Sequence, residues 1–272
     1  MNGKIPKRII IVPYRDREKH KELFLERMND YLKEDDDWEL YFSHQCDRRP
    51  FNRGASRNIG FLAMKVKYPN HYKDISFIFQ DVDTLPVING YFPYDTKDGV
   101  VAHYYGFDFA LGGIVVIKGK DFEKIKGYPN FWGWGFEDNN LYKKCLTNDL
   151  LVDRTIFIEN KNREDRDKYI TRLDNDETKR LLTKEEVYRQ AENNIDDITD
   201  LKNVTFTINN QFINITSFEP KVPHTDRRYY IRDNFKETPI KTGDPVYGAQ
   251  NWGKIMSSVS IINKNRDKIK KS

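Results

Sequence analysis

Two short apolar runs, each followed at once by polar residues, place the strongest constraint on how this chain can fold. Residues 8–12 read RIIIV and lead into Pro13, and residues 75–79 read ISFIF and lead into QDVD. Short, fully apolar runs rich in branched or aromatic side chains are typical of strands buried on both faces of a parallel sheet. In open α/β sheets ligands bind beyond the carboxyl ends of such strands, so the polar residues after each run are candidate site residues.

Helical patterns alternate with these strands, which predicts an α/β fold. Leu23, Phe24 and Met28 recur at helical spacing after the first run. The other expected elements are a strand at 38–44, a helix near 56–66, a strand at 114–117, a short helix after it, a helix at 184–193, and a β-hairpin at 204–218. No repeat or linker is visible, so we expect one main domain over 1–217 and an extension over 218–272 that packs on it and ends in a flexible tail.

Composition excludes several classes of protein. Among 272 residues, 32% are charged and 14% aromatic, which indicates a folded domain. The 46 basic residues are interleaved with 42 acidic ones, so we expect no nucleic-acid partner. Cys46 and Cys145 have no paired spacing, and no apolar run is long enough for a signal peptide or a membrane span. These features predict a cytoplasmic protein, in a bacterium or, for a viral chain, in its host.

The segment Asp81-Val82-Asp83 follows a buried strand and is a candidate metal and sugar site. Carboxylates two residues apart in extended backbone point to opposite sides, so they can serve different groups. One can hold Mn²⁺ or Mg²⁺ on the diphosphate of a nucleotide-sugar, and the other can hold the sugar. The alternative is a pair of turn or capping carboxylates.

The segment FWGWGFEDNN at 131–140 combines aromatic residues, glycines and carboxylates. Tryptophans separated by glycines indicate a mobile lid that stacks on sugars. Glu137 and Asp138 follow the lid, where a carboxylate could accept a proton from an acceptor hydroxyl. The alternative is a turn with buried tryptophans, in which these acids cap a helix that begins near Leu141.

The third cluster comprises Pro13-Tyr14-Arg15-Asp16-Arg17 and Phe51-Asn52-Arg53, each at a strand-to-helix junction. Arginines at such junctions can pair with phosphates, and an aromatic ring can stack on a base, as a nucleotide site requires. Surface salt bridges are the alternative interpretation.

Taken in order, IIVPYRDR, FNRGASRNIGF, FQDVDTLP, LGGIVVI and FWGWGFEDNNLYKK cover about residues 8–155 and resemble the β-1,4-galactosyltransferase family. The resemblance implies a Rossmann-like GT-A fold with a mostly parallel central sheet and a C-terminal β-hairpin extension. It also implies an inverting, Mn²⁺- or Mg²⁺-dependent transfer of galactose from a UDP-sugar donor to a glycan or glycoconjugate acceptor. The alternatives are transfer of N-acetylgalactosamine or another hexose, and a non-catalytic carbohydrate-binding scaffold of the same fold.

The resemblance also assigns roles to single residues. Glu137 would bind sugar hydroxyls, Asp138 would be the general base, and Trp134 would be the lid indole. The donor site would contain Pro13, Tyr14, Arg15, Arg17, Phe51, Arg53, Asp81, Val82, Asp83 and Gly113, with Asp83 on the metal.

The chain departs from the family pattern at three places. A metal-binding histidine is expected about thirty residues after the lid, but that stretch contains none, so we expect His224, with Glu164 or Asp165 as alternatives. Ala110 stands where a tyrosine is usual beside the donor sugar, which leaves room for a larger C2 substituent. Asn139 replaces an acidic residue of the lid segment, which leaves the acceptor open. Nothing in the sequence indicates the oligomeric state.

Overall fold

The structure, a computed structural model, describes residues 4–133, 135–173, 179–180, 196–224 and 231–232. The helices are α1 (Glu18–Tyr31), α2 (Arg53–Lys67), α3 (Gly119–Lys124), α4 (Glu137–Thr147), α5 (Arg163–Tyr169) and the 3-10 turn η1 (Ile198–Asp200). The strands are β1 (Arg8–Tyr14), β2 (Trp38–Gln45), β3 (Ser76–Gln80), β4 (Thr84–Pro86), β5 (Val100–Gly106), β6 (Ile114–Lys118), β7 (Leu151–Asp153), β8 (Ile158–Glu159), β9 (Ile170–Arg172), β10 (Lys179–Arg180), β11 (Lys202–Asn209), β12 (Phe212–Glu219) and β13 (Ile231–Arg232).

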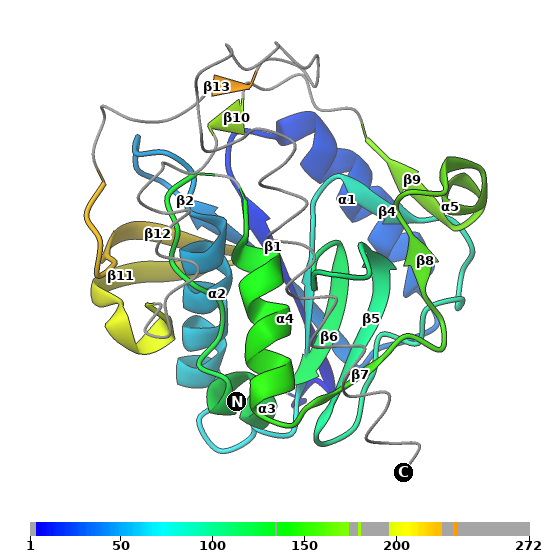
Figure 1. Ribbon diagram of the computed structural model, residues 1–272, viewed down its shortest axis with the longest axis horizontal. Coiled ribbons are helices and arrows are strands. Elements are labelled where there is room, and N and C mark those ends of the chain that lie inside the picture. Colours follow the sequence, from blue (N-terminus) through cyan, green and yellow to red (C-terminus); the bar gives the residue numbers. More distant parts are fainter. Residues whose placement is uncertain (1–3, 134, 174–178, 181–195, 225–230, 233–272) are drawn as a thin grey trace.

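Nine strands form one mixed, mostly parallel sheet in the order β11-β12-β2-β1-β3-β6-β5-β7, with β8 also paired to β5 (Figure 1). Strands β12, β2, β1 and β3 run parallel to one another, and β6 is antiparallel to both β3 and β5. The predicted α/β class and mostly parallel sheet are therefore confirmed. Two smaller pairs, β4-β9 and β10-β13, lie outside the large sheet.

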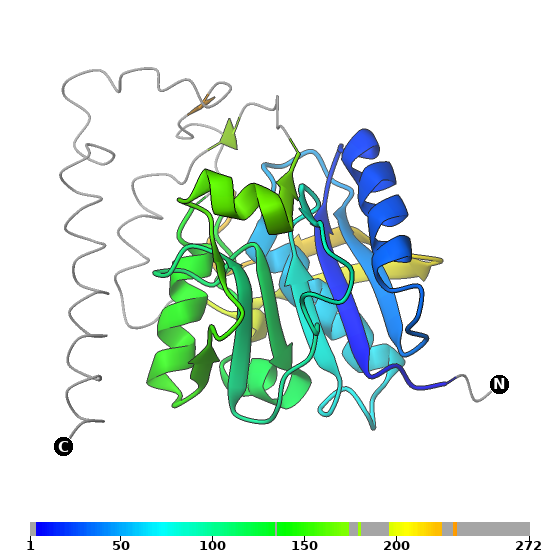
Figure 2. The same ribbon diagram turned by 90° about the vertical axis from the view of Figure 1, so that its right-hand side faces the viewer.

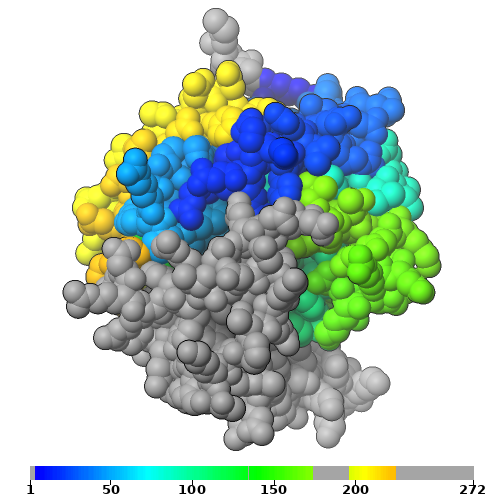
Figure 3. Space-filling model, turned by 90° about the horizontal axis from the view of Figure 1, so that it is seen from above, coloured from blue at the N-terminus to red at the C-terminus, as the bar shows by residue number. Residues whose placement is uncertain are grey.

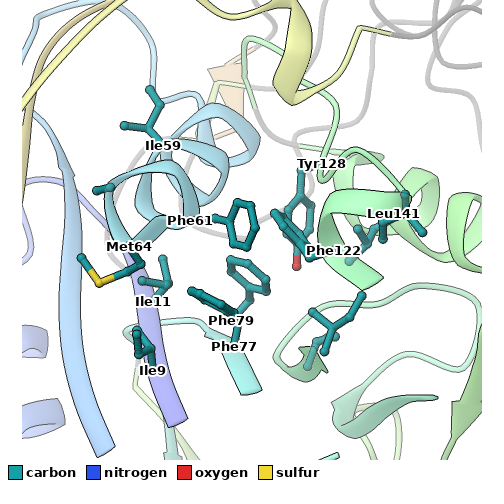
Figure 4. Close-up of a cluster of buried hydrophobic side chains, with 14 of the residues drawn as sticks. Ile9, Ile11, Ile59, Phe61, Met64, Phe77, Phe79, Phe122, Tyr128 and Leu141 are labelled. Carbon is teal, nitrogen blue, oxygen red and sulfur yellow. The ribbon is translucent and has the colours of Figure 1, made fainter. Parts of the chain in front are cut away.

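Helices cover both faces of the large sheet and divide the core into two clusters (Figures 1 and 2). Alternate residues of β1 face opposite sides, as strand geometry requires: Ile9 and Ile11 belong to one cluster, and Ile10 and Val12 to the other. The first cluster lies under α2 and α4 and includes the rings of Phe61, Phe77, Phe79 and Phe122 (Figure 4). The second cluster packs under α1.

Several boundaries differ from the sequence prediction, and each difference has a local cause. Helix α2 begins at Arg53 rather than near residue 56, because the Asn52 side chain accepts a hydrogen bond from the Ala55 N–H and caps it there. The predicted hairpin is formed by β11 and β12, but it is an integral edge of the large sheet, since β12 pairs with β2. The expected helix at 184–193 lies outside the described residues.

The expected domain boundary at 217/218 falls inside β12, which ends at Glu219. The beginning of the expected extension packs on the main domain, because Trp132 stacks on Phe218 and its indole N–H donates to the Val222 carbonyl. Within the described residues, no helix has the length and apolarity needed to cross a membrane. The predicted cytoplasmic location stays a prediction.

Candidate functional site

A cavity of about 1110 Å³ opens beyond the carboxyl ends of β1, β2 and β3. Segments far apart in the sequence lie on the face that Figure 3 views, where blue residues near the N-terminus and green residues near β9 both reach the surface. Ten of the predicted site residues line the cavity: Pro13, Arg15, Arg17, Phe51, Arg53, Asp81, Val82, Asp83, Gly113 and Asp138. The fold therefore gathers most of the three predicted clusters into one place, as the Rossmann-like arrangement predicts.

A network of buried charges forms the floor of the cavity. Arg57, whose side chain is 1% exposed, donates to Asp81 over 2.9 Å and to Asp138 over 2.8 Å. Arg53 donates to the same Asp81 oxygen over 2.6 Å and lies 3.3 Å from Glu137. Burial alone would raise the pKa of Asp81, but these two guanidinium groups hold it well below its ordinary value.

Glu137 and Asp138 are the first two residues of α4, so they do not cap a later helix as the alternative interpretation proposed. Phe136 precedes them with a positive φ of 60°, which turns the chain sharply into the helix. Burial raises the pKa of Asp138 to about 7, although the Arg57 cation opposes this effect. Asp138 can therefore exchange a proton near neutral pH, as a general base must.

Asp83 lies in a turn after β3, closed by a hydrogen bond from the Thr84 N–H to the Asp81 carbonyl, so the segment 81–83 is not extended as expected. The two carboxylates still have different partners. One oxygen of Asp83 accepts a hydrogen bond from Arg172 over 3.1 Å and lies 3.7 Å from Arg17. Among the described residues, no group of three or more His, Cys, Asp or Glu side chains is placed to hold a metal ion.

The segment Leu111-Gly112-Gly113 makes backbone hydrogen bonds to both Asp81 and Asp138. The Asp81 N–H donates to the Gly113 carbonyl, and the Leu111 N–H donates to the Asp138 carbonyl. A Cβ on Gly112 would lie 2.5 Å from an Asp138 carboxylate oxygen, so glycine is needed for this close approach.

Aromatic and basic side chains lie at the predicted nucleotide end of the cavity. The Arg15 guanidinium lies 5.2 Å from the centre of the Phe51 ring and also donates to the Arg49 carbonyl. Tyr14 does not line this cavity: its ring packs edge-on against Phe42 and Phe212, beside a smaller pocket. Burial raises the pKa of Tyr14 to about 12, so it stays neutral.

The lid interpretation is wrong for Trp132 and untested for Trp134. Trp132 is 1% exposed and belongs to the core, because its indole N–H bonds the Val222 carbonyl and its face stacks on Phe218. Arg49 also lies 4.8 Å from its ring centre. Trp134 lies outside the described residues.

The expected additional metal ligand is not among the residues that line the cavity. His224 packs edge-on against Trp132, with 5.4 Å between ring centres. The alternatives, Glu164 and Asp165, are exposed near the start of α5, where Asp165 pairs with Lys168. Each of the three stays a prediction as a metal ligand.

Comparison with known proteins identifies the family. The model of the N-terminal region of glycosyl transferase group 7 matches residues 4–94, and the model described as the N-terminal domain of galactosyltransferase matches residues 101–166. Together they match more than half of the chain, in the order that the motifs predict. The chain belongs to the β-1,4-galactosyltransferase family.

Relatives of this galactosyltransferase-family chain include human β-1,4-galactosyltransferase 4, which is 33% identical over 162 residues. The xylosylprotein 4-β-galactosyltransferase of Caenorhabditis elegans is 31% identical over 156 residues. These matches cover 54% and 53% of this chain, but only 44% and 52% of the relatives. This chain thus spans about half the length of the relatives it matches.

This chain is also similar in fold to a solved structure. A mutant of Drosophila β-1,4-galactosyltransferase 7, in complex with manganese, UDP-Gal and xylobiose, matches with a TM-score of 0.59 and 20% identity. The match covers 78% of this chain and 94% of the fly chain. The predicted GT-A fold is therefore confirmed.

The sequence motifs did not identify two arginines of this site, Arg57 and Arg172. Arg57 lies one helical turn after Arg53, and this i, i+4 spacing is a signal that could have placed both on one face of α2. Arg172 lies far from every motif in the sequence, and only the pairing of β9 with β4 brings it to Asp83. No local pattern predicts that contact.

Proposed function

We propose that this chain is an inverting glycosyltransferase that moves a hexose, most readily galactose, from a UDP-sugar to an acceptor sugar hydroxyl. The observation that carries the proposal is that Asp138, in the first turn of α4, lines the same cavity as the arginines that can bind a diphosphate. The relatives are galactosyltransferases, which supports it. We assign the activity to residues 1–217 and treat 218–272 as an extension.

Donor binding follows from the charges at the end of β1. Arg15 and Arg17 line the cavity, and guanidinium groups bind phosphate oxygens through paired N–H donors. Phe51 lies next to Arg15 and offers a face on which the uracil ring can stack. Arg53 and Asp81 lie deeper, where Asp81 can accept hydrogen bonds from sugar hydroxyls.

Asp138 would act as the base in a single displacement. Its carboxylate accepts the proton of the acceptor hydroxyl while that oxygen forms a bond to the anomeric carbon of the donor sugar. The bond from this carbon to the diphosphate breaks at the same time, and UDP leaves with the bonding electrons. Because attack and departure are in line, the anomeric configuration inverts and no covalent intermediate forms.

Asp83 is the residue that would hold a divalent metal. Hard cations often bind through one carboxylate together with phosphate oxygens and water, so a buried carboxylate at the diphosphate end of the cavity fits Mn²⁺ or Mg²⁺. When bound, such a metal would neutralise charge on the departing diphosphate. The fly relative contains manganese and UDP-Gal, which supports this assignment.

The residues of the cavity specify the identity of the donor sugar less closely than they specify the nucleotide. Ala110 lines the cavity and carries only a methyl group, so a C2 acetamido group could be accommodated. UDP-N-acetylgalactosamine is therefore the second donor to test.

The proposal is tested by calorimetric titration of UDP-galactose, UDP-N-acetylgalactosamine, UDP-glucose and UDP-N-acetylglucosamine, combined with an assay of transfer to xylobiose and N-acetylglucosamine. Asp138→Asn should lower transfer by about 10²- to 10⁴-fold while UDP-sugar affinity stays nearly the same, because the amide cannot accept the proton but keeps an oxygen that can accept from Arg57. Asp121→Asn is the control, since it neutralises a buried carboxylate outside the cavity. Full transfer by Asp138→Asn, or no binding of any UDP-sugar, would refute the proposal, and the second result would favour the scaffold alternative.

A further inference from the structure

Arg172 reaches the cavity because β9 pairs with β4, a pairing that the sequence motifs do not predict. Strand β9 runs antiparallel to β4, and this register places Arg172 opposite Thr84, the residue after Asp83. Its guanidinium donates to Asp83 over 3.1 Å and to the Thr84 hydroxyl over 3.2 Å. The side chain lines the cavity and is 27% exposed, so it is both anchored and accessible to a ligand.

Asp83 already has two cations beside it. The same carboxylate oxygen lies 3.1 Å from Arg172 and 3.7 Å from Arg17, and the Asp83 side chain is only 9% exposed. A metal that binds Asp83 must approach a carboxylate whose charge these guanidinium groups largely balance. The described residues provide no group of three metal-ligating side chains that would offset this competition.

The two guanidinium groups beside Asp83 can themselves bind a diphosphate. Two arginines beside one carboxylate oxygen carry more positive charge than that carboxylate balances, and guanidinium groups bind phosphate oxygens in a planar, paired geometry. Arg172 would therefore meet the diphosphate beside Asp83.

We infer that Arg172 is a cationic ligand for the diphosphate of the donor, so that nucleotide binding persists when divalent metal is removed. The inference rests on the proposed function, because it places a residue in the donor site. It leaves a role for a metal on Asp83, and it makes Arg172 and that metal competitors for the same carboxylate.

The test is calorimetric titration of UDP into the full chain, with Mn²⁺ and separately with chelator, for the wild type, Arg172→Met and Arg172→Lys. Wild type should bind UDP in chelator. Arg172→Met keeps the length of the side chain but removes its charge, and should weaken this binding on the order of 10- to 100-fold. Arg172→Lys keeps the charge but not the planar fork, so its loss should be smaller.

Two further measurements sharpen the test. Arg172→Met should bind Mn²⁺ more tightly than wild type in the absence of nucleotide, because a competing cation has been removed from Asp83. Arg163→Ala, which removes an exposed arginine of α5 outside the cavity, should bind both UDP and Mn²⁺ as wild type does.

The outcomes separate the inference from the proposed function. Equal UDP affinities of wild type and Arg172→Met in chelator would overturn the inference, and so would wild-type binding that requires Mn²⁺. In either case UDP still binds the wild type with metal, and the proposed function stands. No UDP binding by wild type under any condition would overturn both. Should Arg172→Met not fold, the wild-type titration in chelator and the Arg172→Lys comparison still decide the question.

Discussion

At the scale of single residues, Arg57 connects the two halves of the proposed reaction. It is 24 positions from Asp81 and 81 positions from Asp138 in the sequence, yet it donates to both carboxylates. Removing one partner of a buried guanidinium lowers the free energy of unfolding by several kcal/mol, so Arg57 holds both carboxylates firmly. The Tyr128 ring, 4.7 Å away, covers the guanidinium from another side.

The pH dependence of transfer follows from the surroundings of Asp138, which faces Arg57, Glu137, Arg53 and Asp81. Burial raises its pKa to about 7, so Asp138 is protonated and inactive below that pH and is ionised above it. We expect kcat/KM to rise with pH through about 7. Arg57→Met removes a cation that lowers this pKa, so the rise should move to higher pH by about one unit.

The measurement is the profile of kcat/KM against pH, with Arg57→Lys as the charge-preserving control. Arg57→Lys should keep the rise near that of wild type. A wild-type profile that is flat across neutral pH would contradict the assignment of Asp138 as the base.

Gly112 is the residue that lets Asp138 approach the backbone. Gly112→Ala places a methyl group 2.5 Å from the carboxylate oxygen, so the carboxylate has to shift. A shift of about 1 Å at a reacting group lowers kcat on the order of 100-fold. Because the shifted carboxylate is also the partner of Arg57, the melting temperature should fall as well, while UDP affinity should change little. An unchanged kcat would mean that the observed carboxylate position is not the reactive one.

At the scale of elements, the cavity depends on where strands and helices begin and end. Strands β1 and β3 end at the cavity floor, α2 and α4 begin there, and the pairing of β4 with β9 closes one side. The acids Glu137 and Asp138 occupy the first turn of α4, where the helix dipole stabilises negative charge. The helix end therefore favours ionised Asp138, while burial disfavours it.

Trp132 anchors the chain to the core shortly before α4. Trp132→Ala should lower the free energy of unfolding by about 3–5 kcal/mol, because it removes a buried indole that stacks on Phe218 and bonds the Val222 carbonyl. Urea denaturation measures this loss. Leu151→Ala, at a side chain that is 51% exposed, is the control and should change stability by less than about 0.5 kcal/mol. An equally small change for Trp132→Ala would show that this anchor contributes little.

At the scale of the whole molecule, one sheet separates two hydrophobic clusters, and the cavity lies beyond the carboxyl ends of its strands. The net charge is only +4, yet six arginines line the cavity: Arg15, Arg17, Arg48, Arg49, Arg53 and Arg172. Five aspartates line the same cavity, so neither the overall charge nor a count of the lining charges identifies the ligand, and it is the positions of individual arginines that favour a diphosphate.

The sequence by itself determined the alternation of strands and helices from β1 to β3 and ten of the residues that line the cavity. Apolar runs and helical spacing act over neighbouring residues, so β1, β3, α2 and the hairpin could be read directly from the chain. The acids Asp81, Asp83 and Asp138 were found for the same reason, since each follows or begins such an element.

Only the tertiary structure decided how these residues pair. Whether Trp132 is lid or core, and which arginines meet Asp83 and Asp138, depends on strand register and on contacts between segments far apart in the chain. Burial of a charge or an indole is favourable only when partners arrive from elsewhere, and a local pattern contains no information about those partners.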